Sequence, residues 1–94
     1  MVAWQSRNHL SDHFAKHGVE VGARSVEEYH ASARAVLARA DIMFGYDDPE
    51  TGLRRVGHYD SPTDLFTALN EYDEIVTHFR TDSRYVRRLR RDSE

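Results

Sequence analysis

The most regular hydrophobic pattern in the chain lies between residues 26 and 40. Apolar side chains recur there at steps of three and four residues, which is the spacing of an amphipathic helix: Val26, Tyr29, Ala33, Val36, Leu37 and Ala40. Ser25, followed three residues later by Glu28, forms a capping box at the start of this pattern. The helix is therefore expected to begin just after Ser25 and to end near Ala40.

A shorter helix is predicted ahead of it. Ser11 is a good N-cap, so the helix is expected to run from there to His17 and to end at Gly18 in the left-handed conformation. Residues 1–9 then form a lead-in, with Trp4 as the apolar anchor that holds this segment against the body of the protein.

After residue 40 the hydrophobic period changes from helical to alternating. A short apolar run at 42–46 is followed by three predicted strands, at 53–59, 65–70 and 74–80, with turn-forming residues between them. Consecutive strands joined by short turns predict an antiparallel meander. Residues 84–89 are expected to add a last strand or a brief helix, and residues 90–94 a frayed tail.

Two N-terminal helices followed by three or four antiparallel strands predict an α+β fold, with the helices packed on one face of the sheet. The 94 residues can bury one core but not two, so residues 1–94 are expected to form a single domain. No apolar run approaches the roughly 20 residues that cross a bilayer, and the N-terminus lacks the apolar stretch of a signal peptide.

The absence of cysteine excludes disulfides, thiolate metal sites and cysteine nucleophiles. It fits a cytoplasmic site of action, although a domain delivered into a target cell as part of a longer secreted protein would have the same composition.

Charge is strongly segregated along the chain, although the net charge is only −3. Residues 41–74 carry a net charge of −7, whereas residues 80–91 hold six arginines and one acid. Such segregation lets one face of a protein meet phosphates while another stays acidic. The basic run, which includes Arg84, is interpreted either as a platform for a polyanion or as a solvated face.

Three histidines, His9, His13 and His17, follow one another at four-residue steps and would share one helix face. Paired histidines at this spacing can bind zinc, but the glutamate that follows the first histidine in the zinc motif is missing, so no metal or other cofactor is predicted. His13 alone fits a half-buried structural histidine. His17 differs, because it ends a helix and follows Lys16, the only lysine in the chain.

Lys16 and His17 suit the cleavage of RNA. Attack by the ribose 2′-hydroxyl on its own phosphate needs two proton transfers, which histidine can perform near neutral pH, and a cation to stabilise the phosphoryl oxygens. The strand at 77–80 offers further groups, with Thr77 and Phe79 on one face and His78 and Arg80 on the other. Only one of these faces can meet Lys16 and His17, and alternation does not say which.

Two tyrosines are candidates for stacking on RNA bases. Tyr59 and Tyr85 could each hold a base or bind a phosphate, or could equally be amphipathic residues at the edge of the core.

The stretch from His13 to Tyr29, HFAKHGVEVGARSVEEY, resembles the opening of a colicin D-like nuclease domain, which belongs to the barnase–EndoU–colicin–RelE group of RNase toxins. The shared pattern is Lys-His, a small residue, a glycine a few positions on, and then a capped helix. The segment Thr77-His78-Phe79-Arg80 is similar to the family's downstream strand of hydroxyl, any residue, aromatic and basic residue. The chain departs from the family at Val21, usually aromatic, at Phe79, usually Trp, and in lacking a lysine-rich face.

The resemblance implies roles for individual residues. His17 would be the catalytic histidine, with or without the help of His13, and Lys16 the lysine that faces the phosphate. Thr77, Phe79 and Arg80 would lie near the scissile phosphate.

The activity implied is metal-independent endonucleolytic cleavage of RNA, commonly tRNA, leaving a 2′,3′-cyclic phosphate. A cognate immunity or antitoxin protein would cover the site. Three alternatives remain open from the residues alone: a non-catalytic protein-interaction module, a histidine-based metal-binding protein, and an RNA-binding protein that does not cleave.

Overall fold

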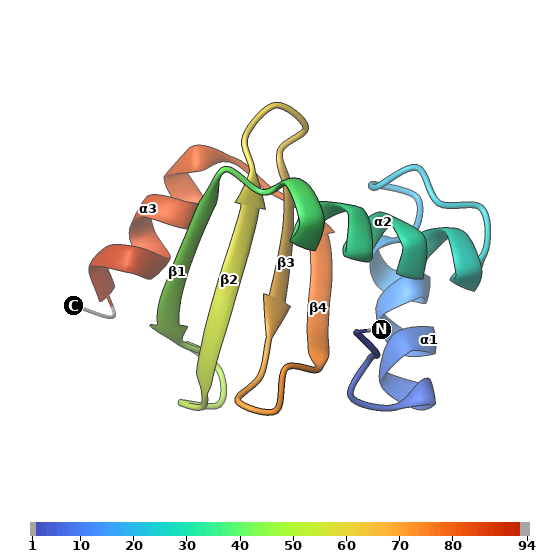
Figure 1. The fold of residues 1–94 in the computed structure, drawn as a ribbon, viewed down its shortest axis with the longest axis horizontal. Coiled ribbons are helices and arrows are strands. Elements are labelled where there is room, and N and C mark those ends of the chain that lie inside the picture. Colours follow the sequence, from blue (N-terminus) through green and yellow to red (C-terminus); the bar gives the residue numbers. More distant parts are fainter. Residues whose placement is uncertain (1, 93–94) are drawn as a thin grey trace.

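The computed structural model describes residues 2–92 and has an α+β architecture, as predicted (Figure 1). Two helices come first, four strands follow, and a third helix ends the described chain. The elements are α1 (Arg7–His17), α2 (Val26–Arg39), β1 (Ile42–Asp47), β2 (Arg54–Asp60), β3 (Leu65–Leu69), β4 (Ile75–Arg80) and α3 (Ser83–Asp92). No helix within residues 2–92 has the length and apolar character needed to span a membrane.

The four strands form one antiparallel sheet in the order β1-β2-β3-β4, so the predicted meander is confirmed. Its register places Phe44 opposite Gly57, Gly57 opposite Ala68, and Ala68 opposite Thr77. Directly opposed residues share a face of a sheet, so this row marks one face from β1 to β4. The register shifts between Ala68 and Leu69, which adds an irregularity to β4 at Val76.

Helix α2 begins and ends where the hydrophobic period predicts. The Ser25 side chain accepts a hydrogen bond from the backbone N–H of Glu28 at 3.1 Å, which completes the N-terminal cap. The buried residues of α2, Tyr29, Ala33 and Val36, all belong to the predicted apolar stripe. The helix packs against β2 and β3.

The N-cap of helix α1 lies five residues earlier than predicted. It is Ser6, whose side chain accepts from the backbone N–H of His9 at 3.0 Å, and Ser11 lies exposed within the helix. Gly18 also differs from the prediction, because it has right-handed helical torsions and the left-handed glycine is Gly22, with φ +80°. The turn that follows α1 is therefore completed at Gly22.

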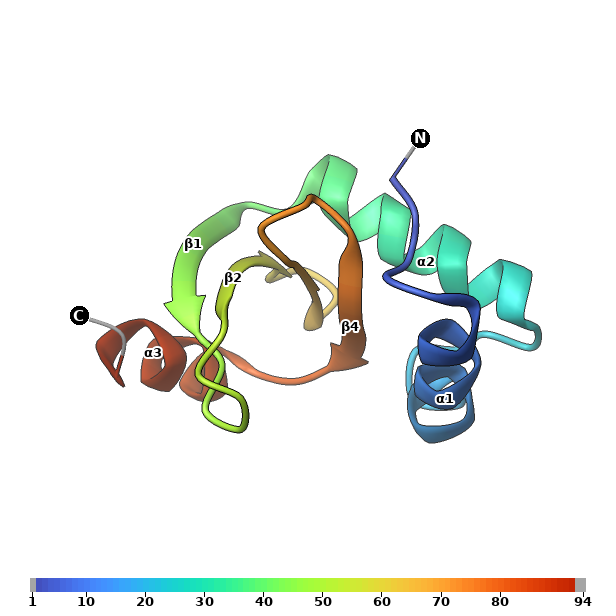
Figure 2. The ribbon, with the colours of Figure 1, turned by 90° about the horizontal axis from the view of Figure 1, so that it is seen from below.

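The lead-in behaves as expected at Trp4, which is 7% exposed and forms a parallel bridge with Ile75 on β4. The backbone N–H of Ile75 donates to Ala3, and that of Gln5 donates to Ile75, so the N-terminal segment covers the outer edge of β4. This pairing sets α1 beside β4 (Figure 2).

The C-terminal segment, for which a last strand or a brief helix was predicted, is the helix α3, and it packs on the face of the sheet opposite to α2. Tyr85 on α3 contacts Phe66 and Phe79, whereas the neighbouring strand residues Thr67 and His78 face α2. Figure 2 shows the curved sheet with α2 on one side and α3 on the other. The predicted frayed tail is helical through residue 92, and residues 93–94 lie outside the described part of the chain.

Candidate functional site

A cavity of about 520 Å³ lies on the α3 side of the sheet, between α1 and the loop that joins β1 to β2. We call it the histidine cavity. One wall comes from α1 and consists of His9, His13, Lys16 and His17. The floor comes from β4, and the opposite wall includes Tyr46, Asp48, Arg55 and Tyr85. Segments more than 60 residues apart in the sequence thus meet around one space.

The three histidines of α1 form a row along this wall. The rings of His9 and His13 are stacked with centroids 4.6 Å apart, and those of His13 and His17 are 5.9 Å apart. His9 Nε2 lies 2.8 Å from the carbonyl oxygen of Val76, which can only accept, so this nitrogen carries the proton. His9 therefore fastens α1 to β4 and orients the ring that stacks on His13.

His13 is held neutral by its surroundings. Burial, together with the nearby charges of His9, His17 and Lys16, lowers the pKa of His13 from 6.5 to about 4. Its Nδ1 lies 3.4 Å from Thr77 Oγ1 on β4. At pH 7 this imidazole can accept a proton or a hydrogen bond, and it carries no charge.

His17 is oriented by a carboxylate that sequence reasoning did not single out. Its Nδ1 lies 3.0 Å from Glu20 Oε1, and this contact leaves Nε2 available to a ligand. Burial acts to raise the pKa of Glu20, but the hydrogen bonds from His17 and from the Arg80 backbone outweigh it, so this pKa is lowered. Glu20 therefore stays ionised at neutral pH and favours a proton on Nδ1.

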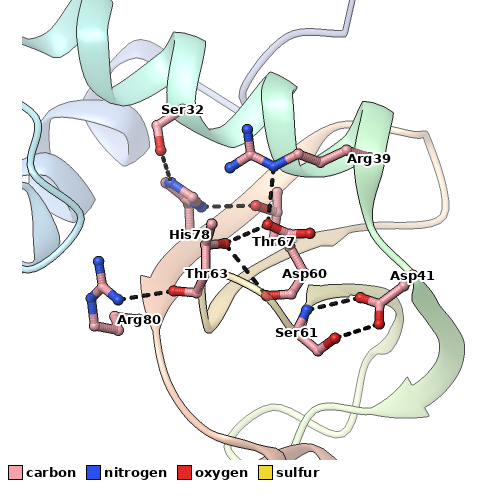
Figure 3. Close-up of polar contacts among 9 residues, drawn as sticks. All are labelled: Ser32, Arg39, Asp41, Asp60, Ser61, Thr63, Thr67, His78 and Arg80. Atoms are coloured by element: carbon pink, nitrogen blue, oxygen red, sulfur yellow. Dashed lines mark hydrogen bonds and ion pairs between the residues drawn. The ribbon is translucent and has the colours of Figure 1, made fainter.

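Arg80 supports Glu20 rather than facing the cavity. Its backbone N–H donates to Glu20 Oε2 at 3.0 Å and its Nε donates to the Glu20 carbonyl oxygen at 2.8 Å. A third bond, from Nη1 to the Thr63 carbonyl oxygen at 2.8 Å, ties the side chain to the loop after β2 (Figure 3). The expected contact between Arg80 and a phosphate does not fit this arrangement.

The face of β4 that meets α1 is the one carrying Thr77 and Phe79, both of which line the cavity. The Phe79 ring lies 5.6 Å from that of His17. His78 points to the other face and is fully buried. It contacts Ser32 Oγ and Thr67 Oγ1, each at 2.8 Å (Figure 3), so the expected substrate contact of His78 does not fit its position.

Of the three remaining predicted residues, one lines the cavity and two do not. Tyr85 lines the cavity, whereas Tyr59 is 1% exposed and its hydroxyl donates to Asp64. Arg84 does not line the cavity; it is exposed at the start of α3 and its nearest recorded ion pair is with Asp82, at 3.5 Å. Of the ten predicted residues, the structure brings six to the cavity: His13, Lys16, His17, Thr77, Phe79 and Tyr85.

Sequence reasoning missed the part of the wall opposite α1 that comes from β1, β2 and the loop between them. Tyr46 and Arg55 are directly paired across β1 and β2, and Asp48 follows at the end of β1. A period-two pattern marks which strand residues share a face, but it does not show that the β1–β2 loop comes close to α1.

No group of three or more histidine, aspartate or glutamate side chains within residues 2–92 is arranged to hold a metal ion. The histidine row does not form such a group, although its spacing along the helix would allow two ligands.

We compared the chain with protein-family models, with curated proteins and with solved structures, and nothing in any of these comparisons matches it. The site therefore has to be interpreted from its own chemistry.

Proposed function

We propose that this protein is a metal-independent endoribonuclease of toxin type, with the histidine cavity as its active site. The observation that supports the proposal most is the meeting of two distant motifs. Lys16 and His17 lie on one wall of the cavity, and Thr77 and Phe79 lie on its floor. These are four of the residues through which the sequence resembles colicin D-like nucleases, and their meeting was not implied by secondary structure alone.

The reaction is a transfer of the phosphate diester within the RNA. The 2′-oxygen forms a bond to phosphorus as it loses its proton, and the bond from phosphorus to the 5′-oxygen breaks as that oxygen gains one. The products are a 2′,3′-cyclic phosphate and a free 5′-hydroxyl. Two proton transfers and one stabilised phosphorane are therefore required.

The cavity offers a group for each requirement. Neutral His13 is available to take the proton of the 2′-hydroxyl, with Thr77 bonded to its Nδ1. His17 in its imidazolium form, with Nδ1–H donating to Glu20, is available to protonate the leaving oxygen through Nε2–H. Lys16 supplies positive charge beside both histidines. Phe79 and Tyr85 offer aromatic surface for a flanking base.

The test is incubation of the purified protein with total tRNA and other cellular RNA in EDTA, followed by sequencing of the new ends. Cleavage is expected, with a cyclic phosphate at the new 3′ end of the upstream fragment and a hydroxyl at the new 5′ end of the downstream fragment. His17→Ala should lose on the order of 10²–10⁴-fold in rate, the range for a general acid or base. The matched control is His30→Ala on α2, because His30 is outside the cavity and contacts the Val2 carbonyl.

Two results would contradict the proposal. Full activity in His17→Ala would remove the role assigned to that histidine. Binding of tRNA without any cleavage would instead identify an RNA-binding protein.

The proposal includes tRNA as the substrate, a cytoplasmic site of action, and a cognate immunity or antitoxin protein that covers the cavity. The supporting feature for an inhibitor is that Lys16, on the α1 wall of the cavity, is exposed. A genuine inhibitor should abolish cleavage at a one-to-one ratio and protect the α1 amides from hydrogen exchange.

A further inference from the structure

Arg55 on β2 is a buried cation that the proposed proton transfers do not use. Its side chain is 10% exposed and lines the histidine cavity on the wall opposite α1. Its Nη1 donates to the carbonyl oxygen of Arg54 at 3.3 Å, but its Nε has no hydrogen-bond partner among the described residues. The Asp48 Oδ2 atom is 4.0 Å from this Nε, which is too far for a hydrogen bond.

An unpaired donor of this kind indicates a place for an acceptor. Leaving a buried N–H without a partner costs free energy, and the cost is greater for a charged group. Arg55 Nε has almost no accessible surface, so a ligand oxygen or ring nitrogen would remove this cost once the guanidinium turns toward the cavity. Because Arg55 lines the same cavity as Lys16 and His17, this ligand would be part of the molecule that reaches the two α1 residues.

Two carboxylates at this end of the cavity restrict the ligand further. Asp48 and Glu50 both line it, and the Glu50 backbone N–H donates to Asp48 Oδ1 at 2.8 Å, which fixes the Asp48 side chain. The two carboxylates also affect the Tyr85 hydroxyl. Its pKa is raised mainly by burial and further by the negative charges of Asp48 and Glu50. The two carboxylates would repel a phosphate. They would not repel a neutral group that carries both hydrogen-bond acceptors and donors.

A nucleobase has the required combination. Each base presents ring or carbonyl acceptors beside N–H donors on one edge, and has a flat face that stacks on aromatic rings. Aromatic surface is present here, because the rings of Tyr85 and Phe79 meet edge to face with centroids 5.6 Å apart. We define the Arg55 subsite as the end of the cavity formed by Tyr46, Asp48, Arg55 and Tyr85.

We propose that the Arg55 subsite binds a single nucleobase of the RNA, next to the phosphate that Lys16 and His17 act on. Arg55 Nε–H donates to an acceptor on the base edge, and the Asp48 carboxylate accepts from a neighbouring N–H. This inference rests on the proposed function for its substrate, and it adds that the enzyme selects the base on one side of the cleaved bond.

The first test does not depend on cleavage. In ¹⁵N-labelled full-length protein, the Arg55 Nε–H resonance is followed by NMR during titration with each of the four ribonucleosides and, separately, with inorganic phosphate. A shift with at least one nucleoside and none with phosphate is expected. The Nε–H of the adjacent Arg54, which is 59% exposed and paired with Asp47, is the internal control and should not move.

The other outcomes of this titration overturn the inference. A shift with phosphate alone would make the subsite an anion site, and no shift with any of these ligands would mean that it binds neither. The titration measures binding only, and the cleavage of RNA by the wild-type protein is measured in a separate assay. The Arg55 subsite can therefore be wrong while the proposed function is right, and the reverse.

The second test measures selectivity. Chimeric oligonucleotides with a single ribose and one varied neighbouring base are cleaved by the wild type, Arg55→Lys and Asp48→Asn. The wild type should prefer its best base over its worst by about tenfold or more, since one well-placed pair of base contacts discriminates by that order. Both variants should reduce this ratio, whereas the matched control Arg54→Lys should keep it.

Asp48→Asn keeps the test valid if Arg55→Lys does not fold. The amide oxygen of the asparagine can still accept the hydrogen bond from the Glu50 backbone N–H. Equal rates for all four bases in the wild type, or an unchanged ratio in Asp48→Asn and Arg55→Lys, would refute base selection by the Arg55 subsite.

Discussion

The buried imidazole of His78 should make the protein less stable in acid by a calculable amount. His78 is fully buried between β4 and α2, and it contacts the hydroxyls of Ser32 and Thr67 (Figure 3). Its backbone carbonyl accepts a hydrogen bond from the Tyr29 hydroxyl. Burial lowers the pKa of His78 from 6.5 to about 4, against the opposing effect of its bond to the Phe66 carbonyl.

The direction of the effect follows from these two pKa values. Above pH 6.5 the imidazole is neutral in both the folded and the unfolded chain, so it adds no pH dependence. Between pH 6.5 and pH 4 the unfolded chain takes up a proton that the folded chain does not, and the free energy of unfolding falls. The full difference is about 3 kcal/mol, at about 1.4 kcal/mol for each unit of pKa.

Urea denaturation of the wild type and of His78→Gln at pH 7.5, 6.5, 5.5 and 4.5 measures this effect. The variant should be less stable at pH 7.5, because it loses hydrogen bonds in the core, and the deficit should shrink toward pH 4.5. Taking the difference between the two proteins cancels the contributions of His13 and His58, whose pKa values are also lowered by burial. Ser32→Ala is the control that keeps the imidazole, so its deficit should not shrink. A deficit of His78→Gln that stays constant within about 0.5 kcal/mol over this range would refute the reasoning.

Two further substitutions test the parts of the fold that hold the site. Glu20→Gln should disturb the His17 ring, because an amide cannot accept from both His17 Nδ1 and the Arg80 N–H as the two carboxylate oxygens do. Imidazole ¹⁵N spectra should show His17 protonated at Nδ1 in the wild type and a mixture of tautomers in the variant; an unchanged spectrum would count against the positioning role. Gly57→Ala should destabilise the protein by about 1–3 kcal/mol, because its Cβ would lie 2.9 Å from the Phe66 ring and 3.1 Å from that of Phe44. Calorimetry that finds no decrease in the melting temperature would show that the two rings can move apart.

The sequence predicted the elements that depend on local signals. The stripe of α2 and its Ser25 cap, the turns between strands and the alternation of β4 are all set by residues close to one another in the chain. The start of α1 was placed wrongly, because the prediction used Ser11 as the cap whereas the structure uses Ser6. Ser6 is selected by a distant contact, since the pairing of Trp4 with Ile75 fixes where the chain enters the helix.

The composition of the cavity depended on contacts that no local pattern contains. Alternation separated Thr77 and Phe79 from His78 and Arg80, but the choice between the two faces is made by α2. Ser32 and Tyr29 supply polar partners for the imidazole and backbone of His78, so this residue is satisfied inside the core. The opposite face is left to line the cavity. Arg55 was not predicted as a site residue, because no local pattern shows whether a side chain finds a hydrogen-bond partner in the fold. The structure shows that its Nε has none among the described residues.

Arg80 shows how a residue can fit a resemblance in sequence while the structure gives it a different set of contacts. The resemblance places a basic residue near the phosphate, yet the guanidinium here uses Nε and Nη1 to bind two backbone carbonyls, of Glu20 and Thr63. These bonds join the turn after α1 to the loop after β2, and the backbone N–H of Arg80 adds a bond to the Glu20 carboxylate. A lysine would keep the charge but could not reproduce this fork of donors. In the proposed cleavage, Arg80 is therefore expected to act through the position of Glu20 and His17. Lys16 and Arg55 are the lysine and the arginine that line the cavity.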